Sequence, residues 1–296
     1  MGAPANESMV ITDVPLTDKE FDALRTLIYD QAGICLRETK MALLKGRLTK
    51  RLRHYKYESF AQYYEHLTHK DPQGTELQEM INAITTNKTS FFRESHHFEC
   101  LREQVLTPAR QAAAQGKRSS LRIWSAGCST GEEAYTIAIT IAETLERLTT
   151  WDVKILATDI DTGVLEKGRQ GIYPRDSVSD VPKAMLHKYF LSGKGKSSHL
   201  VQVKPALRNL VRFARLNLME PWPFRGKFDA IFCRNVIIYF DRDSQRHVLE
   251  GFARYLKPNG RFFAGHSENL FWMGDFFHPV GHTVYVVGGQ RGAEHV

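Results

Sequence analysis

Polar residues follow several short apolar runs in the second half of the sequence. Asp159 and Asn217 come directly after such a run, and Asn235 follows another run one residue later. A carboxylate can accept two hydrogen bonds from the cis-diol of a ribose, and an amide both donates and accepts. These residue types therefore indicate a binding site for a nucleoside.

A glycine loop with the sequence SAGCSTGEE occupies residues 125–133. Gly127 and Gly131 let the backbone pass close to a ligand, although a tight turn without a ligand would also use them. The loop lacks the third glycine of the dinucleotide fingerprint G-x-G-x-x-G. Glu132 and Glu133 open the following helix, where a pyrophosphate would need bare amide groups. Acidic residues there favour a neutral or cationic ligand, such as S-adenosylmethionine with its cationic sulfonium.

Three histidines, His96, His97 and His266, could suggest a metal site or a general base. No ligand spacing typical of a zinc site accompanies them. We therefore predict that these histidines are structural and that the protein has no metal site.

The elements that must position these side chains follow from a change of pattern near residue 120. Short β-rich runs then alternate with helical stretches, which is typical of an α/β fold with a parallel sheet and right-handed crossovers. In such an open sheet the ligand binds at the carboxyl ends of the strands. We expect strands at 121–126, 153–158, 210–216, 228–233 and 261–264, and helices at 132–148, 162–169 and 242–256.

Two segments depart from this alternation. The last β-rich runs, 276–279 and 283–287, are joined by three residues, which predicts a hairpin and an antiparallel edge of the sheet. Residues 171–209 contain turn material before a short strand-like run at 200–203. We predict that residues 171–209 form an inserted β-subdomain.

The first 115 residues are predicted to be helical, because they lack strand-like runs. Thr17 and Glu20 form a capping-box pattern, which predicts a helix start, and Gly33 predicts the end of that helix.

The net charge of +7 is concentrated in two segments. Residues 37–56 carry eight cations and one anion, and residues 171–209 carry seven cations and two anions. The first segment lies on a predicted helix whose apolar face repeats every three or four residues. The basic side chains expected to face solvent on this helix are Arg47, Lys50, Arg51 and His54.

Three interpretations of the basic helix are open: a nucleic-acid contact, an acidic helical partner, or a solvated face. A nucleic-acid methyltransferase would be expected to carry Asn-Pro-Pro-Tyr or Pro-Cys, and the sequence has neither. This disfavours nucleic acid as the substrate.

The chain has 296 residues, of which 42% are hydrophobic and 25% are charged, as in one large or two smaller globular domains. Its apolar runs are far shorter than the roughly 20 residues that a membrane helix needs. The first residues do not resemble a signal peptide. We therefore expect a cytoplasmic protein.

Six motifs closely resemble those of the chemotaxis receptor methyltransferases, the CheR family. In chain order they are NKTSFFRE (87–94), WSAGCSTGEE (124–133), ATDID (157–161), IFCRNVIIYFD (231–241), LKPNG (256–260) and GHSEN (265–269). The resemblance implies a small all-helical N-terminal domain at 12–90. It also implies a doubly wound methyltransferase domain at 91–290 that contains the β-subdomain at 171–209.

The resemblance also implies an activity. The family transfers a methyl group from S-adenosylmethionine to glutamate side chains on the cytoplasmic helices of chemoreceptors, which leaves S-adenosylhomocysteine and a glutamate methyl ester. The positions that match the family's cofactor contacts are Asn87, Thr89, Arg93, Glu133, Asp159, Asn217, Leu218, Asn235 and Val236. To these the glycine loop adds Gly127.

The resemblance further implies that the basic helix docks a receptor, through Arg47, Lys50, Arg51 and Arg53. In some members the β-subdomain holds a pentapeptide at the receptor's C-terminus. We expect a monomer that is recruited to membrane chemoreceptors without inserting into the membrane or binding nucleic acid. The alternatives are a non-catalytic S-adenosylmethionine sensor, an NAD-dependent dehydrogenase, and a nucleic-acid methyltransferase that uses the basic helix.

A glutamate carboxylate is already ionised at pH 7, so methyl transfer to it needs orienting donors and no general base. The enzyme must strip water from the carboxylate and aim one oxygen at the methyl group. We predict that Arg93 and Tyr239 are these donors. The structural alternatives are a surface ion pair for Arg93 and a core aromatic for Tyr239.

Overall fold

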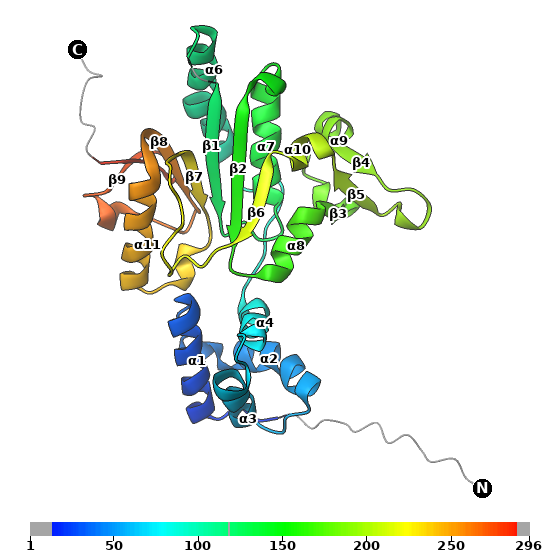
Figure 1. The fold of residues 1–296 in the computed structure, drawn as a ribbon, viewed down its shortest axis with the longest axis vertical. Coiled ribbons are helices and arrows are strands. Elements are labelled where there is room, and N and C mark those ends of the chain that lie inside the picture. The colour runs from blue at the N-terminus through cyan, green and yellow to red at the C-terminus, as the bar shows by residue number, and fades with distance from the viewer. Residues whose placement is uncertain (1–13, 118, 289–296) are drawn as a thin grey trace. The chain divides into compact units, whose positions relative to one another are not determined.

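The computed structural model describes residues 14–117 and 119–288, and the chain divides into two compact units between Thr85 and Thr86. The N-terminal unit is helical, and the second unit is a mixed sheet flanked by helices (Figure 1). This confirms the predicted fold class, a helical domain followed by an α/β domain. Among the described residues, no helix combines the length and the apolar character needed to cross a membrane.

The helices of the N-terminal unit are α1 (Asp18–Ala32), α2 (Met41–Tyr55), α3 (Phe60–Glu65) and α4 (Thr75–Ile84). The Thr17 hydroxyl accepts a hydrogen bond from the backbone N–H of Glu20, and the Glu20 carboxylate accepts one from the N–H of Thr17. Gly33 ends α1 in the left-handed conformation, with φ 68°. The predicted capping box and glycine end are therefore confirmed.

The apolar face of α2 packs against α4. Leu44, Leu48 and Leu52 are buried, as their spacing predicts, and on α4 Met80 and Ile84 are buried. These side chains form part of the core of the N-terminal unit, to which α1 and α3 add further buried apolar residues.

Part of the basic face of α2 is turned inward, which the sequence did not predict. Glu76 on α4 is only 2% exposed, and the Arg51 guanidinium pairs with its carboxylate, with Nε 2.8 Å from Oε1. Burial alone would raise the pKa of Glu76, but hydrogen bonds from Arg51, Tyr63 and Tyr55 outweigh it and lower that pKa. The prediction that Arg51 faces solvent is wrong, because a buried carboxylate needs a cationic partner.

Arg47 also binds within the N-terminal unit. Its guanidinium donates to the carbonyl oxygens of Ile84 and Thr85, at a helix end where carbonyl groups lack partners inside the helix. The prediction that Arg47 points freely to solvent is therefore wrong as well. Lys50 and His54 are exposed as predicted, and Arg53 is exposed as well, so these three side chains form the solvent-facing basic part of α2.

A seven-stranded sheet forms the centre of the second unit, in the order β6-β2-β1-β7-β8-β10-β9. Its strands are β1 (Ser120–Ala126), β2 (Asp152–Asp159), β6 (Val211–Arg215), β7 (Phe228–Cys233), β8 (Leu256–Ala264), β9 (Phe277–Gly281) and β10 (Val284–Val287). Neighbouring strands from β6 to β8 run parallel, and β10 is antiparallel to both β8 and β9. The predicted parallel sheet with a hairpin edge is confirmed.

Helices cover both faces of this sheet (Figure 1). The helices are α5 (His96–Leu101), α6 (Thr107–Ala114), α7 (Glu132–Thr144), α8 (Thr162–Gln170) and α11 (Arg242–Tyr255). Successive side chains of a strand point to opposite faces, so Ile123 of β1 joins one buried cluster with Ile137 of α7. Trp124 joins a second cluster with Phe252 of α11. These two apolar layers fix the strands and therefore the loops at their carboxyl ends.

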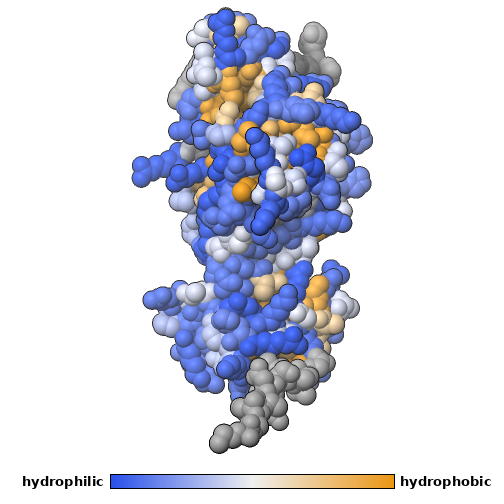
Figure 2. Space-filling view, turned by 90° about the vertical axis from the view of Figure 1, so that its right-hand side faces the viewer, coloured by the Kyte–Doolittle hydropathy of each residue, from blue (hydrophilic) through white to orange (hydrophobic). Residues whose placement is uncertain are grey.

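A small antiparallel sheet, here called the β-subdomain, is inserted between β2 and β6. Its strands are β3 (Ile172–Pro174), β4 (Phe190–Ser192) and β5 (Leu200–Val203), in the order β3-β5-β4, and the helices α9 (Lys183–Tyr189) and α10 (Pro205–Arg208) flank them. The face of the molecule that carries it is mostly hydrophilic, with scattered hydrophobic patches (Figure 2). Its two edge strands each expose one large apolar side chain, Ile172 and Leu191.

Candidate functional site

The polar residues predicted from the sequence lie at one edge of the large sheet. The last residue of β1 pairs with Thr158 of β2 and with Cys233 of β7. Because these parallel strands end at the same level, Gly127, Asp159 and Arg234 leave the sheet next to one another. This is the edge at which open α/β sheets bind ligands.

The loop after β1 is shaped by two glycines. Gly127 has φ 73° and Gly131 has φ 94°, both in the left-handed region that favours glycine. A Cβ on Gly127 would lie 2.3 Å from Cγ2 of Val236, and a Cβ on Gly131 would lie 2.9 Å from the Phe213 ring. The loop therefore presses its backbone against Val236, one of the predicted cofactor positions.

Asp159, at the end of β2, is 8% exposed. Its Oδ2 accepts a hydrogen bond from the N–H of Ser129 at 2.8 Å, and its Oδ1 accepts one from the N–H of Asp161 at 3.0 Å. Burial raises the pKa of Asp159, and these backbone donors oppose the shift. A carboxylate has about four acceptor positions, more than these backbone donors use, so the group can still accept a hydrogen bond from a ribose.

The segment before α5 is fastened to the glycine loop. The Asn87 side-chain amide donates to Asp161 at 2.7 Å, and the Asn87 carbonyl oxygen accepts a hydrogen bond from the Ser129 hydroxyl at 2.8 Å. Residues 86–90 therefore lie in the second unit, whereas the sequence prediction placed them in the first domain. Thr89 is half-buried in the same segment.

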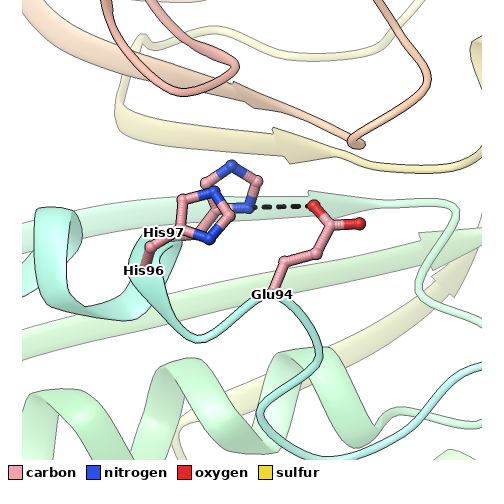
Figure 3. Close-up of side chains that lie close together, drawn as sticks. All are labelled: Glu94, His96 and His97. Atoms are coloured by element: carbon pink, nitrogen blue, oxygen red, sulfur yellow. Dashed lines mark ion pairs between the residues drawn. The ribbon is translucent and has the colours of Figure 1, made fainter.

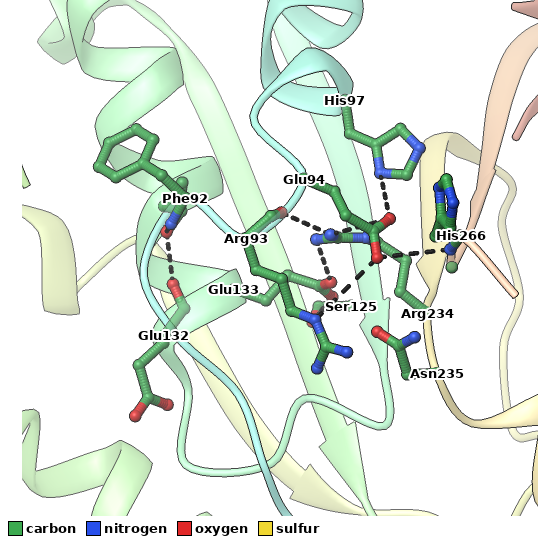
Figure 4. Close-up of polar contacts among 12 residues, drawn as sticks. Phe92, Arg93, Glu94, His97, Ser125, Glu132, Glu133, Arg234, Asn235 and His266 are labelled. Atoms are coloured by element: carbon green, nitrogen blue, oxygen red, sulfur yellow. Dashed lines mark hydrogen bonds and ion pairs between the residues drawn. The ribbon is translucent and has the colours of Figure 1, made fainter. Parts of the chain in front are cut away.

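A buried guanidinium joins several of the predicted residues (Figure 4). Arg234 donates from Nη1 to Oε2 of Glu133 at 3.1 Å and from Nη2 to the carbonyl oxygen of Arg93 at 2.5 Å. Its Nη2 also lies 3.3 Å from the Glu94 carboxylate. The Ser125 hydroxyl donates to the other oxygen of Glu133 at 2.6 Å. Arg234 thus holds the turn that carries Arg93 against the start of α7.

This role of Arg234 was not predicted from the sequence. Burial raises the pKa of Glu133, and the charge of Arg234 opposes that shift. A charged residue directly after the buried apolar run at 231–233 was the available signal, because a buried charge needs a counter-charge.

The two predicted catalytic residues are partly exposed. The Arg93 guanidinium donates to the carbonyl oxygen of Lys88 at 2.9 Å and lies 4.0 Å from the Glu94 carboxylate. Tyr239 lies in the turn after β7 and is 37% exposed. The core-aromatic alternative for Tyr239 is therefore wrong, and its side chain is accessible to a ligand.

Asn217 and Leu218 follow β6, whose last residue pairs with Asp159. Asn217 is buried, and its side chain accepts from the N–H of Met219 and donates to Glu220, both at 3.1 Å. Leu218 packs in the buried cluster of Trp124. Asn235 and Val236 are half-buried in the turn after β7.

Glu94, His96 and His97 lie close enough together to suggest a metal site (Figure 3). His97 Nε2 lies 2.9 Å from the Thr283 hydroxyl, and its Nδ1 faces Glu94 at 3.5 Å. Burial and the nearby Arg234 charge lower the pKa of His97 to about 3, so the ring is neutral at pH 7. Because Arg234 already neutralises Glu94 and would repel a divalent cation, the cluster fits a structural role better.

Two family models match the chain. The model described as CheR methyltransferase, SAM binding domain, matches residues 87–286, and the model described as CheR methyltransferase, all-alpha domain, matches residues 19–85. The bounds of the second model end where the helical unit ends.

Known proteins resemble the chain over most of its length. Chemotaxis protein methyltransferase 2 of Pseudomonas aeruginosa is 45% identical over 270 residues, which cover 91% of this chain and 93% of that protein. Chemotaxis protein methyltransferase of Escherichia coli is 43% identical over 274 residues, 92% of each chain. The protein of the same name from Borreliella burgdorferi is 40% identical over 267 residues, 90% of this chain and 93% of that one.

Both matched domains, the identity to these relatives and the predicted motifs agree with the site at the carboxyl edge of the sheet. The chain belongs to the CheR methyltransferase family and is an S-adenosylmethionine-dependent methyltransferase.

Proposed function

We propose that this protein transfers a methyl group from S-adenosylmethionine to glutamate side chains of chemoreceptors and forms glutamate methyl esters. The names of its relatives place them in chemotaxis. The structural observation that supports the proposal most directly is a pair of buried carboxylates, Asp159 bonded to the glycine loop and Glu133 at the end of that loop. These carboxylates would repel a phosphate, but they suit a ribose and a sulfonium.

We propose that the cofactor is held by the residues matched to the family: Asn87, Thr89, Arg93, Gly127, Glu133, Asp159, Asn217, Leu218, Asn235 and Val236. Asp159 is assigned to the ribose, because a carboxylate has about four acceptor positions, more than its backbone donors use. When bound, the cofactor supplies an electrophilic methyl group. The contacts among Asn87, Ser129 and Asp161 hold the proposed site together before any ligand arrives.

Arg93 and Tyr239 are proposed to orient the substrate carboxylate. A guanidinium presents parallel N–H groups that match the two oxygens of a carboxylate, and a phenol adds a single donor. Both side chains are partly exposed, so an incoming glutamate can reach them. Arg234 fixes the backbone of Arg93, which leaves the Arg93 guanidinium as the adjustable part.

Receptor docking is proposed to depend on Lys50 and Arg53 of α2, since both are exposed. Arg47 and Arg51 add positive charge to the same helix, but their guanidinium groups serve the N-terminal unit. An acidic receptor helix is the proposed partner, because opposite charges steer encounter and lose strength as salt rises.

Changing Lys50 and Arg53 together to Glu is expected to raise the KM for a chemoreceptor fragment about 10-fold at low salt, because each change replaces attraction by repulsion. Affinity for S-adenosylmethionine should stay unchanged. The matched control changes the exposed Lys19 and Lys70 to Glu, which alters net charge equally. An unchanged receptor KM in the α2 variant would contradict the docking proposal. Arg51 is unsuitable for this test, since its loss leaves Glu76 buried without its cation.

The β-subdomain is proposed to bind a receptor C-terminal pentapeptide and so to recruit the protein, as a monomer, to membrane chemoreceptors. Within the part of the chain that the structure describes, its outer strands β3 and β4 each have one side without a partner strand, and an extended peptide can add to such an edge through backbone hydrogen bonds. The exposed Leu191 on β4 offers an apolar contact.

The proposed activity is tested by incubating the full chain with cytoplasmic chemoreceptor fragments and S-adenosylmethionine labelled in its methyl group. Base-labile label on the receptor is expected, because methyl esters hydrolyse in base whereas N-methyl groups do not.

A further inference from the structure

A buried carboxylate outside the predicted site holds the turn that follows β7. Glu268, in the loop after β8, is 4% exposed. Its Oε2 accepts hydrogen bonds from the backbone N–H groups of Asn235 at 2.8 Å and Gly265 at 2.6 Å. Its Oε1 accepts from the N–H groups of Val236 and Ile237, each at 2.8 Å. One side chain therefore binds consecutive amide groups of a segment about 30 residues earlier in the chain.

Successive backbone N–H groups that point to one place form a concave anion site. Here the anion is supplied by the protein itself. Asn235 has φ 60°, a conformation that is uncommon for a residue other than glycine and that surrounding contacts must maintain. The Glu268 carboxylate provides such contacts, because it accepts hydrogen bonds from the N–H of Asn235 and from the N–H of the next residue, Val236.

The fit is equally tight on the opposite side of the carboxylate. A Cβ on Gly265 would lie 2.6 Å from the backbone nitrogen of Asn235 and 2.8 Å from Oε2 of Glu268. A residue with a side chain at 265 would therefore displace either the turn or the carboxylate. This contact explains Gly265 and Glu268 of the motif GHSEN (265–269), to which the proposed chemistry assigns no role.

The turn held by Glu268 contacts the glycine loop. Val236 packs so close to Gly127 that a Cβ on Gly127 would lie only 2.3 Å from Val236 Cγ2. Because Val236 is part of the turn, the position of the turn determines where Val236 contacts the loop. Asn235 and Val236 are also two of the proposed cofactor contacts. Movement of the turn would therefore disturb the glycine loop and the proposed cofactor site together.

We propose that Glu268 is a positioning residue of the cofactor site: its carboxylate fixes the backbone of residues 235–238 so that Asn235 and Val236 are in place before the cofactor binds. This inference rests on the proposed assignment of those two residues to the cofactor. Glu268 acts through the turn, since both of its oxygens are occupied by backbone donors.

Glu268→Gln tests the proposal with a side chain of the same size. The amide group of glutamine has one oxygen and one NH2 group. In the variant the NH2 group must therefore face backbone N–H groups that donate to a carboxylate oxygen in the wild type. We expect the dissociation constant for S-adenosylmethionine, measured by calorimetric titration of the full chain, to rise about 10-fold or more. Gly265→Ala should weaken cofactor binding in the same direction, and it decides the question if Glu268→Gln does not fold.

Glu76→Gln is the matched control, because Glu76 is an equally buried, multiply hydrogen-bonded carboxylate in the N-terminal unit. Its unfolding midpoint should fall, while its affinity for S-adenosylmethionine stays within about 2-fold of wild type. A folded Glu268→Gln or Gly265→Ala protein with wild-type cofactor affinity would overturn this inference and leave the proposed function untouched. Failure of the wild-type chain to bind S-adenosylmethionine would instead overturn the proposed function.

Discussion

Asp159→Asn is expected to weaken the binding of S-adenosylmethionine at least about 100-fold. Two hydrogen bonds to a charged group, at roughly 1.5 kcal/mol each, correspond to about 3 kcal/mol of binding free energy. In the wild type, the N–H groups of Ser129 and Asp161 donate to the Asp159 carboxylate. The substitution places an NH2 group against one of these N–H groups. Calorimetric titration of the variant with S-adenosylmethionine measures the effect.

Asp229→Asn is the control for this result. Asp229 lies near the start of β7, at the opposite end of the strand from the site, and its carboxylate accepts hydrogen bonds from the N–H of Arg122 at 2.8 Å and from Lys257 at 2.7 Å. Its loss should lower stability and leave cofactor affinity unchanged. Equal affinity of wild type and Asp159→Asn would remove Asp159 from the proposed site.

Arg234→Met is expected to lower the free energy of unfolding by about 3–5 kcal/mol, the usual cost of leaving a buried charge without its partner. Arg234 touches two carboxylates, Glu133 and Glu94, and the carbonyl oxygen of Arg93. Methionine keeps the aliphatic stem, so the effect reports the guanidinium. Urea unfolding of both proteins measures the difference.

The destabilisation should depend on pH with a defined sign. Burial raises the pKa of Glu133, and Arg234 opposes that shift, so the variant's Glu133 binds a proton more readily in the folded than in the unfolded protein. Folding then becomes more favourable as pH falls. Loss of Arg234 also raises the pKa of His97, which Arg234 helps to lower, and this acts in the same direction.

The loss of stability in Arg234→Met should therefore be smaller at about pH 5 than at about pH 8. Arg102→Met is the matched control, since Arg102 forms an exposed pair with Glu103, and such pairs contribute about 1 kcal/mol at most. A variant whose destabilisation is the same at both pH values would show that Glu133 is not left charged and unpaired.

Much of the fold could be predicted because its signals are local. The capping box of Thr17 and Glu20 and the short link between the last two strands each lie within a few residues. The parallel sheet follows from the alternation of short apolar runs and helices. The place of Asp159 beside Gly127 then follows from the register of parallel strands.

The contacts that could not be predicted join residues far apart in sequence. Arg51 turns inward because Glu76 is buried 25 residues later. Arg234 binds Glu133, which lies 101 residues away in the sequence. Glu268 binds backbone N–H groups, and because nearly every residue type has one, the sequence does not show which of them it binds. Charge periodicity on one helix cannot reveal a counter-charge on another, so part of a basic face was predicted to be free when it is not.

Mass spectrometry of chemoreceptor fragments, after incubation with the full chain and S-adenosylmethionine, tests the proposed activity most directly. The expected result is the added mass of one methylene group on particular glutamates, removed by mild base and absent with the Asp159→Asn protein. Fragments in which those glutamates are replaced by glutamine should gain no methyl group. A wild-type protein that binds S-adenosylmethionine yet leaves the glutamates of several receptors unmodified, or methylates another residue type, would contradict the proposed function.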